Sequence, residues 1–85
     1  MKNEDISSQV REFLLKELLT DEDPSSIDYS TPLISTGVLN SLATLQLVTF
    51  LEDTYEISVK AREVGIDYMD SISDMTSFVQ SKLQG

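Results

Sequence analysis

The stretch Gly37-Val38-Leu39-Asn40-Ser41-Leu42 opens the apolar helix that decides the fold, which we predict from Ser41 to about Tyr55. Asn40 is a good N-cap for this helix, because its side-chain oxygen can accept a backbone N–H of the first turn. Apolar residues follow at three-residue steps at Leu42, Leu45, Val48 and Leu51, with Leu47 and Phe50 widening the stripe. Ser41 is therefore expected in the first turn, where unpaired N–H groups and the helix dipole favour a phosphate ester on its hydroxyl.

The length and charge of the chain limit its organisation and its partners. Its 85 residues have room for one domain, which we take as residues 1–85. Six basic and fifteen acidic residues give a formal net charge of −9. This balance argues against nucleic acid and anionic membrane surfaces, since both need clustered Lys and Arg. It suits basic partner proteins, or it only keeps a small protein soluble, and composition leaves both interpretations open.

The absence of cysteine and histidine limits the chemistry that the chain can perform. The common nucleophile–base pairs and the usual zinc sites cannot form, so we predict no catalytic residue, no metal site and no enzyme. The carboxylate pairs Glu52 with Asp53 and Asp67 with Asp70 are interpreted as solvated surface charge. No segment approaches the length of a membrane span, and the cytoplasm is the expected location.

The segment before the central helix is predicted as a helix from Glu4 to about Thr20, followed by a long loop from Asp21 to Asn40. The apolar face of the first helix is formed by Ile6, Val10, Phe13, Leu14 and Leu18, with Leu15 and Leu19 toward its flank. Apolar residues of the loop can pin it across a helical core, namely Ile27, Tyr29, Leu33, Ile34, Val38 and Leu39. We interpret the loop as an ordered crossover between two roughly parallel helices.

The segment after the central helix is predicted to contain two further helices. Ile57 and Val59 alternate with polar residues and suggest a short extended link. The next stretch, Ala61 to Asp70, makes at most a short or distorted helix, because it contains a central glycine. The last helix starts near Ser71 or Ser73, either of which can cap it, and its apolar face consists of Met75, Phe78, Val79 and Leu83.

Ser41 by itself is typical of a residue in a helix cap, but its neighbours favour a further role. The segment from Leu33 to Leu42, with the helix to Tyr55, resembles the modification site of acyl carrier and peptidyl carrier proteins. That family has a hydrophobic pair, a loop glycine, and then Asp-Ser-Leu at the start of its second helix. The order of elements resembles the family over nearly all 85 residues.

The resemblance implies an all-α fold, a small four-helix bundle of acyl-carrier-protein type with a long ordered loop between helices 1 and 2 and a short third helix. It implies that Ser41 carries 4′-phosphopantetheine, whose thiol holds an acyl or aminoacyl group as a thioester. Asn40, Leu42, Leu45 and Thr49 would contact partner proteins, although core packing is an open alternative for Leu45. The expected partners are a phosphopantetheinyl transferase, an acyl- or aminoacyl-loading ligase and downstream transferases, all acting on a monomeric carrier.

Departures from the family pattern bear on the pathway. Asn40 stands where many members have aspartate, and no charged residue occurs from Ser41 to Leu51. Ala43 and Gln46 occupy the face on which carriers of fatty acid synthesis usually present acids. The Gly37–Leu42 run, and the region from Glu63-Val64 to Met69-Asp70-Ser71-Ile72, are more similar to stand-alone carriers such as D-alanyl carrier proteins, or to those of peptide and polyketide pathways. This resemblance implies a dedicated biosynthetic pathway rather than bulk fatty acid synthesis. The alternatives are an unmodified acidic helical adaptor that binds partner proteins, and a hydrolase that uses carboxylates.

Overall fold

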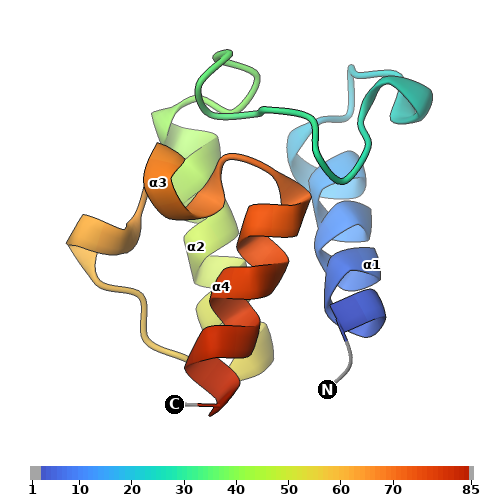
Figure 1. The fold of residues 1–85 in the computed structure, drawn as a ribbon. Coiled ribbons are helices and arrows are strands. Elements are labelled where there is room, and N and C mark those ends of the chain that lie inside the picture. The colour runs from blue at the N-terminus through green and yellow to red at the C-terminus, as the bar shows by residue number, and fades with distance from the viewer. Residues whose placement is uncertain (1–2, 85) are drawn as a thin grey trace.

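This computed structural model describes residues 3–84, which contain four α-helices joined by two long connections and one short one (Figure 1). The helices are α1 (Asn3–Phe13), α2 (Ser41–Tyr55), α3 (Ile66–Met69) and α4 (Ile72–Gln84), and residues 3–84 contain no strand. The prediction of a small all-α bundle, with a long loop after the first helix and a short third helix, is confirmed. No helix within this range combines the length and the apolarity needed to cross a membrane.

The loop between α1 and α2 stays at the end of the bundle where α1 stops (Figure 1). α1 runs toward this end and α2 runs away from it, so the prediction of a crossover between roughly parallel helices is wrong. A crossover would have to span the length of the 15-residue α2, about 22 Å. The loop instead turns locally, because Asp23 Oδ1 accepts the Ser25 N–H and Asp28 Oδ1 accepts the Ser30 N–H, both at 2.9 Å.

The end of the first helix widens into a π-helical segment over Leu14–Leu18. The Leu19 N–H donates to the Leu14 carbonyl at 2.6 Å, which closes a ring one residue longer than that of an α-helix. The wider turn brings Leu19 into the core with 4% of its surface exposed, whereas Leu18 is only half-buried. The prediction that Leu19 lies toward the flank is therefore wrong, whereas Leu18 packs against the core from its edge, as a partly buried residue.

The buried face of α2 also differs from the predicted stripe. It consists of Thr44, Leu47, Val48, Leu51 and Tyr55. A helix turns about 100° per residue, so three-residue steps fall short of a full turn and Leu42 lies on the side opposite Leu51. Leu42 and Leu45 consequently point away from the core, with 66% and 58% of their surfaces exposed.

Apolar residues of the two long connections complete the core. Ile27, Leu33 and Leu39 of the first loop are buried, as predicted, whereas Tyr29 is exposed. In the second connection, Gly65 has a φ of +139° and lies directly before α3. The glycine therefore precedes the short helix, which begins only at Ile66, and does not interrupt a longer one.

Helix α4 begins where one of the two predicted caps places it. Ser71 Oγ accepts the Asp74 N–H at 3.1 Å, so Ser71 is the residue that caps α4. The predicted apolar face is confirmed for Met75, Phe78 and Val79. It is wrong for Leu83, which lines an open hollow beside residues 56–58.

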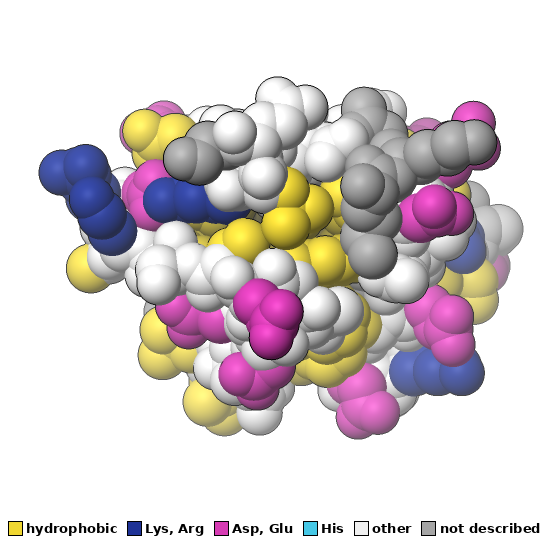
Figure 2. Space-filling model, turned by 90° about the horizontal axis from the view of Figure 1, so that it is seen from below, with side chains coloured by type: hydrophobic (Ala, Val, Ile, Leu, Met, Phe, Trp, Pro, Cys, Tyr) yellow, Lys and Arg dark blue, Asp and Glu magenta, His cyan; other side chains and the backbone are white. Residues whose placement is uncertain are grey.

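The end of the bundle away from the long loop shows how the charge is spread (Figure 2). Acidic side chains lie at several places around this face, with few basic side chains among them and apolar side chains between. The acidic side chains of this face are thus distributed around it and not gathered in one cluster.

Candidate functional site

The junction between the long loop and α2 has the geometry predicted for it. Asn40 has extended backbone, and its Oδ1 accepts the Ala43 N–H at 2.8 Å. The Asn40 carbonyl accepts both the N–H and the hydroxyl of Thr44, at 2.9 and 2.8 Å. Ser41 is the first residue of α2 and is exposed. The predictions of Asn40 as N-cap and of Ser41 in the first turn are confirmed.

An open groove of about 530 Å³ lies beside Ser41. It is lined by the loop at Ile34, Gly37 and Leu39, by the start of α2 at Asn40, Ser41, Thr44 and Leu45, and by Val64 and Gly65 before α3. Gly37 has a φ of +82°, a backbone conformation that residues with a side chain rarely adopt. Its N–H donates to the Ile34 carbonyl at 3.0 Å. The loop thus folds back on itself immediately before the serine.

The surroundings of Ser41 fit a group attached through phosphate. The lining of the groove contains no charged residue, and the first turn of α2 contains no acid. A phosphodiester on Ser41 would therefore meet no carboxylate within this lining. It would lie at the N-terminus of a 15-residue helix, where N–H groups and the dipole favour an anion.

Of the four residues predicted to contact partners, Leu42, Leu45 and Thr49 lie on one exposed flank of α2, and Asn40 is the cap at its start. Asn40 and Leu45 line the groove with Ser41, whereas Leu42 and Thr49 lie outside that lining. Leu42 and Thr49 are exposed, and the Thr49 hydroxyl donates to the Leu45 carbonyl at 3.1 Å. The alternative of core packing for Leu45 is wrong. Contact with a partner stays a prediction for all four residues.

Asp70 is a residue of this region whose role the sequence did not indicate. It follows α3 directly, and its Oδ1 accepts the N–H groups of Leu33, Ile34 and Ser35 at 3.2, 2.8 and 2.8 Å. Its Oδ2 accepts the Ser35 hydroxyl at 2.7 Å. The Ser35 N–H, followed by its hydroxyl and the Ile34 and Leu33 N–H groups, holds the pKa of the Asp70 carboxyl below its usual value, against a smaller opposing effect of burial.

The interpretation of both carboxylate pairs as solvated surface charge needs correction. It is wrong for Asp70, and wrong also for Glu52, whose Oε2 accepts the Val59 N–H at 3.0 Å. Asp53 and Asp67 are exposed. Local sequence gave no sign of these bonds, because each joins a carboxylate to backbone at a distant or irregular position.

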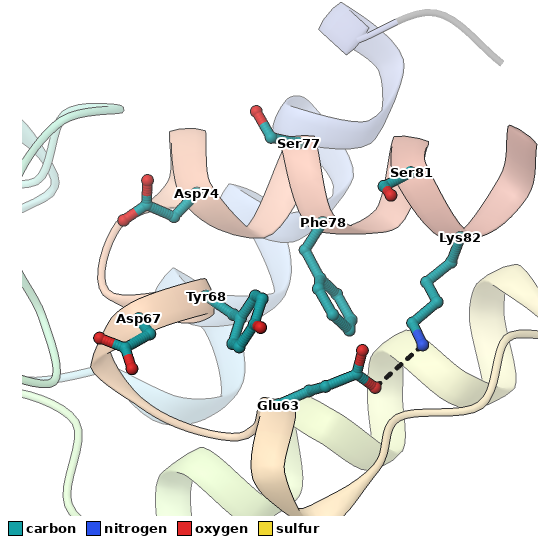
Figure 3. A pocket seen from close by; sticks show the side chains of 8 residues that line it. All are labelled: Glu63, Asp67, Tyr68, Asp74, Ser77, Phe78, Ser81 and Lys82. Carbon is teal, nitrogen blue, oxygen red and sulfur yellow. Dashed lines mark hydrogen bonds and ion pairs between the residues drawn. The ribbon is translucent and has the colours of Figure 1, made fainter. Parts of the chain in front are cut away.

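A second hollow, of about 400 Å³, lies between the segment around α3 and helix α4 (Figure 3). Glu63 and Lys82 form an ion pair at one end, the rings of Tyr68 and Phe78 lie in the middle, and Asp67 lies at the other end (Figure 3). It shares no lining residue with the groove at Ser41. Within residues 3–84, no group of three acidic residues could hold a metal ion.

No family model matches the chain, and no curated protein matches it significantly. The function of the chain is therefore inferred from the geometry of the Ser41 site and from the resemblance of its motif. That geometry offers an exposed hydroxyl at a helix start, an uncharged groove beside it, and two exposed leucines on the same helix.

Proposed function

We propose that this chain is a carrier protein whose Ser41 bears 4′-phosphopantetheine and which itself catalyses no reaction. The observation that carries the proposal is the exposed Ser41 hydroxyl at the first residue of α2, beside a groove lined by uncharged residues. When attached, the arm's terminal thiol holds an acyl or aminoacyl group as a thioester. The missing cysteine is consistent with this role, because the reactive sulfur comes from the attached group.

Attachment is a substitution at phosphorus in coenzyme A. The Ser41 Oγ attacks the phosphorus that bears pantetheine and forms a P–O bond, while the bond from that phosphorus to the bridging pyrophosphate oxygen breaks. Adenosine 3′,5′-bisphosphate leaves, and the Ser41 proton passes to a base on the transferase. The carrier contributes the exposed hydroxyl and a helix N-terminus that favours the phosphate oxygens.

Partner enzymes would meet an apolar, uncharged helix flank. Leu42 and Leu45 are 66% and 58% exposed, and the stretch from Ser41 to Leu51 has no charge. Exposed apolar side chains at a helix surface suit contact with another protein. The expected partners are a phosphopantetheinyl transferase, a loading ligase and downstream transferases of a dedicated cytoplasmic pathway, which act on the carrier as a monomer.

Intact-protein mass tests the proposal directly. The chain is incubated with coenzyme A and a broad-specificity phosphopantetheinyl transferase, with Ser41→Ala alongside. Ser73→Ala is the matched control, because Ser73 is likewise an exposed serine in the first turn of a helix. One phosphopantetheine should be added to the wild type and to Ser73→Ala, and none to Ser41→Ala. Failure of several transferases to modify the wild type would contradict the proposal, and Asn40→Asp would then show whether the missing charge is responsible.

The same exposed leucines also favour a second candidate, an unmodified adaptor. Leu42 and Leu45 can bind a protein whether or not Ser41 is modified. An adaptor would bind its partner equally well after Ser41→Ala and would lose binding after Leu42→Ala. A carrier would lose its activity with Ser41→Ala while its helical content stayed unchanged.

A further inference from the structure

We infer that Asp70 is a positioning residue that holds Ser41 in the conformation required for modification, although it lies 29 positions after the serine in the chain. The inference rests on the proposed function. It concerns a contact between the end of α3 and the loop before α2, which are far apart in sequence.

The carboxylate of Asp70 binds the loop at one short segment. Its two oxygens accept three backbone N–H groups and one hydroxyl from residues 33–35, at 2.7 to 3.2 Å. The Leu33 N–H also donates to the Asp70 carbonyl at 2.7 Å. Bonds to an ionised acceptor are about twice as strong as bonds between neutral groups. Segment 33–35 is therefore fixed to the residue that follows α3 mainly by its backbone, with the Ser35 hydroxyl as the one side-chain partner.

The fixed segment in turn holds the residues that lead into α2. The Leu33 carbonyl accepts the Leu39 N–H at 2.9 Å, and the Ile34 carbonyl accepts the Gly37 N–H at 3.0 Å. Leu39 is 2% exposed and directly precedes the Asn40 cap. Each step from Asp70 to the cap is thus a hydrogen bond or a peptide bond, and Ser41 is the next residue.

A carboxylate is needed at this position because all of its partners are donors. Asparagine has nearly the same shape, but it is uncharged, so its oxygen would accept the backbone N–H groups more weakly, and its amide would have to donate to the Ser35 hydroxyl oxygen where Asp70 accepts from it. Asp67 provides a matched control. It is an exposed acid three residues earlier, so Asp67→Asn removes the same charge and leaves the loop contacts in place.

We call the hydrogen bonds between Asp70 and residues 33–35 the clamp. Loss of the clamp should affect recognition of the carrier by the transferase more than the transfer step. If the loop leaves its bound arrangement, only a fraction of the chains presents Ser41 correctly, and the apparent KM rises by the inverse of that fraction. Saturating carrier restores the rate, so kcat changes little. We expect Asp70→Ala to raise the KM for the carrier about tenfold, Asp70→Asn to raise it less, and Ser35→Ala to raise it least.

Two measurements on the full chain test this inference. The first is the initial rate of phosphopantetheine transfer from coenzyme A against carrier concentration, for the wild type, Asp70→Ala, Asp70→Asn, Ser35→Ala and Asp67→Asn. The second is hydrogen exchange at the Leu39 and Ala43 N–H groups, which needs no transferase. The expected result is a raised KM with faster exchange at both amides in the Asp70 and Ser35 variants, and wild-type behaviour in Asp67→Asn.

Other outcomes overturn the inference. One is an unchanged KM and unchanged exchange in the Asp70 variants. Another is a loss of rate that sucrose reverses, since an osmolyte that favours the folded chain would correct a purely global loss of stability. If Asp70→Ala does not fold, Asp70→Asn and Ser35→Ala decide the question. If no transferase modifies the wild type, the proposed function fails, and exchange at Leu39 and Ala43 still shows whether Asp70 orders the junction.

Discussion

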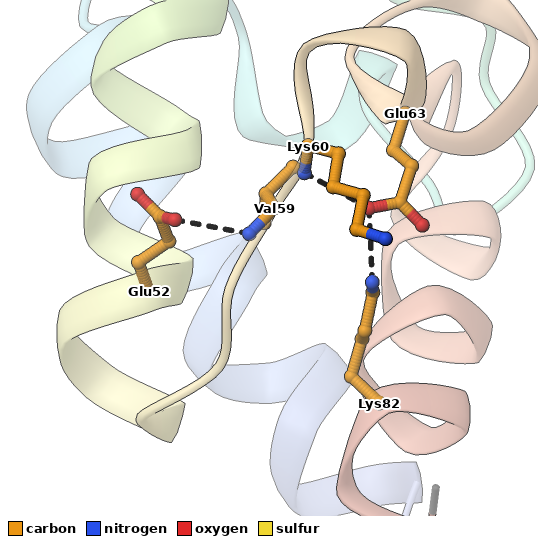
Figure 4. A network of polar contacts seen from close by, with 5 residues as sticks. All are labelled: Glu52, Val59, Lys60, Glu63 and Lys82. Carbon is orange, nitrogen blue, oxygen red and sulfur yellow. Dashed lines mark hydrogen bonds and ion pairs between the residues drawn. The ribbon is translucent and has the colours of Figure 1, made fainter.

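Lys82 Nζ lies 2.9 Å from Glu63 Oε1, so one ammonium joins the connection before α3 to helix α4 (Figure 4). The same nitrogen lies 5.4 Å from the centre of the Phe78 ring. The same Glu63 oxygen accepts the Lys60 N–H at 2.9 Å. The Lys60 N–H and then Lys82 hold the pKa of the Glu63 carboxyl below its usual value. The irregular connection is therefore tied to α4 by a carboxylate with two donors.

Glu63→Gln should lower the thermal midpoint more than Glu12→Gln does. Glu12 also pairs with a lysine, Lys16, at 2.7 Å, but the side chains of both residues are more than half exposed. Such exposed pairs contribute little to the free energy of unfolding. The Glu63 and Lys82 side chains are only 15% and 26% exposed. Thermal unfolding followed by circular dichroism compares the two variants. Equal midpoints would show that the less exposed pair adds nothing beyond an exposed one.

Leu47→Ala should lower the stability of the fold, whereas Leu45→Ala should leave it nearly unchanged, although the two residues are only two positions apart on α2. Leu47 is fully buried, so its truncation leaves a cavity and should cost about 2–5 kcal/mol of unfolding free energy. Leu45 is 58% exposed, so its truncation should change stability by less than about 0.5 kcal/mol. Urea unfolding measures both values. Leu45→Ala should instead weaken partner binding, and normal binding would remove this residue from the proposed interface.

Glu56→Gly should stabilise the chain. Glu56 ends α2 with a φ of +54° and a ψ of +47°, a left-handed conformation that glycine adopts without strain. Relief of that strain, reduced by the greater freedom of glycine in the unfolded chain, should add about 0.5 kcal/mol. Glu56→Gln is the control, since it removes the charge and keeps the backbone strain. The prediction fails if both variants gain the same stability in urea unfolding.

Acid should remove the stabilising effect of Asp70. Its pKa is below the ordinary 3.8 in the folded chain, so the ionised carboxylate stabilises the fold above that value, and the effect is lost as the pH falls through the lower folded pKa. The difference in unfolding free energy between wild type and Asp70→Asn should be constant above about pH 5 and shrink below about pH 4. Asp23 and Asp28, whose pKa values are also lowered by hydrogen bonds, titrate in both proteins and cancel in this difference. A difference that does not vary with pH would contradict the prediction.

Local signals were enough to predict the junction at Ser41. The cap of Asn40 acts on an N–H only three residues ahead, and the cap of α4 at Ser71 is equally short-ranged. The face of α2 was less predictable, because apolar residues cover more than one side of it. Only the three-dimensional packing shows that Leu47 is inside and Leu45 outside.

The clamp at Asp70 could not be predicted from local pattern. Its partners lie 35 to 37 residues earlier in the chain, and they are mostly backbone N–H groups, which every residue type except proline carries. The direction of the long loop was mispredicted for a different reason, because its turns depend on bonds between residues only two apart. The turns at Asp23 and Asp28 fold the loop back on itself, so that it spans a shorter distance. Hydrophobic periodicity does not indicate such turns.

The π-helical segment at Leu14–Leu18 makes the helix tolerant of one particular deletion. The buried Leu19 lies five positions after the buried Leu14, whereas a regular α-helix would bring a residue onto the same face after about four. A chain lacking the exposed Glu17 would bring Leu14 and Leu19 to the four-residue spacing of a regular helix, and both could keep their places in the core. Relatives of this protein are therefore expected to differ by single-residue gaps at this point, without any change in the helices that follow.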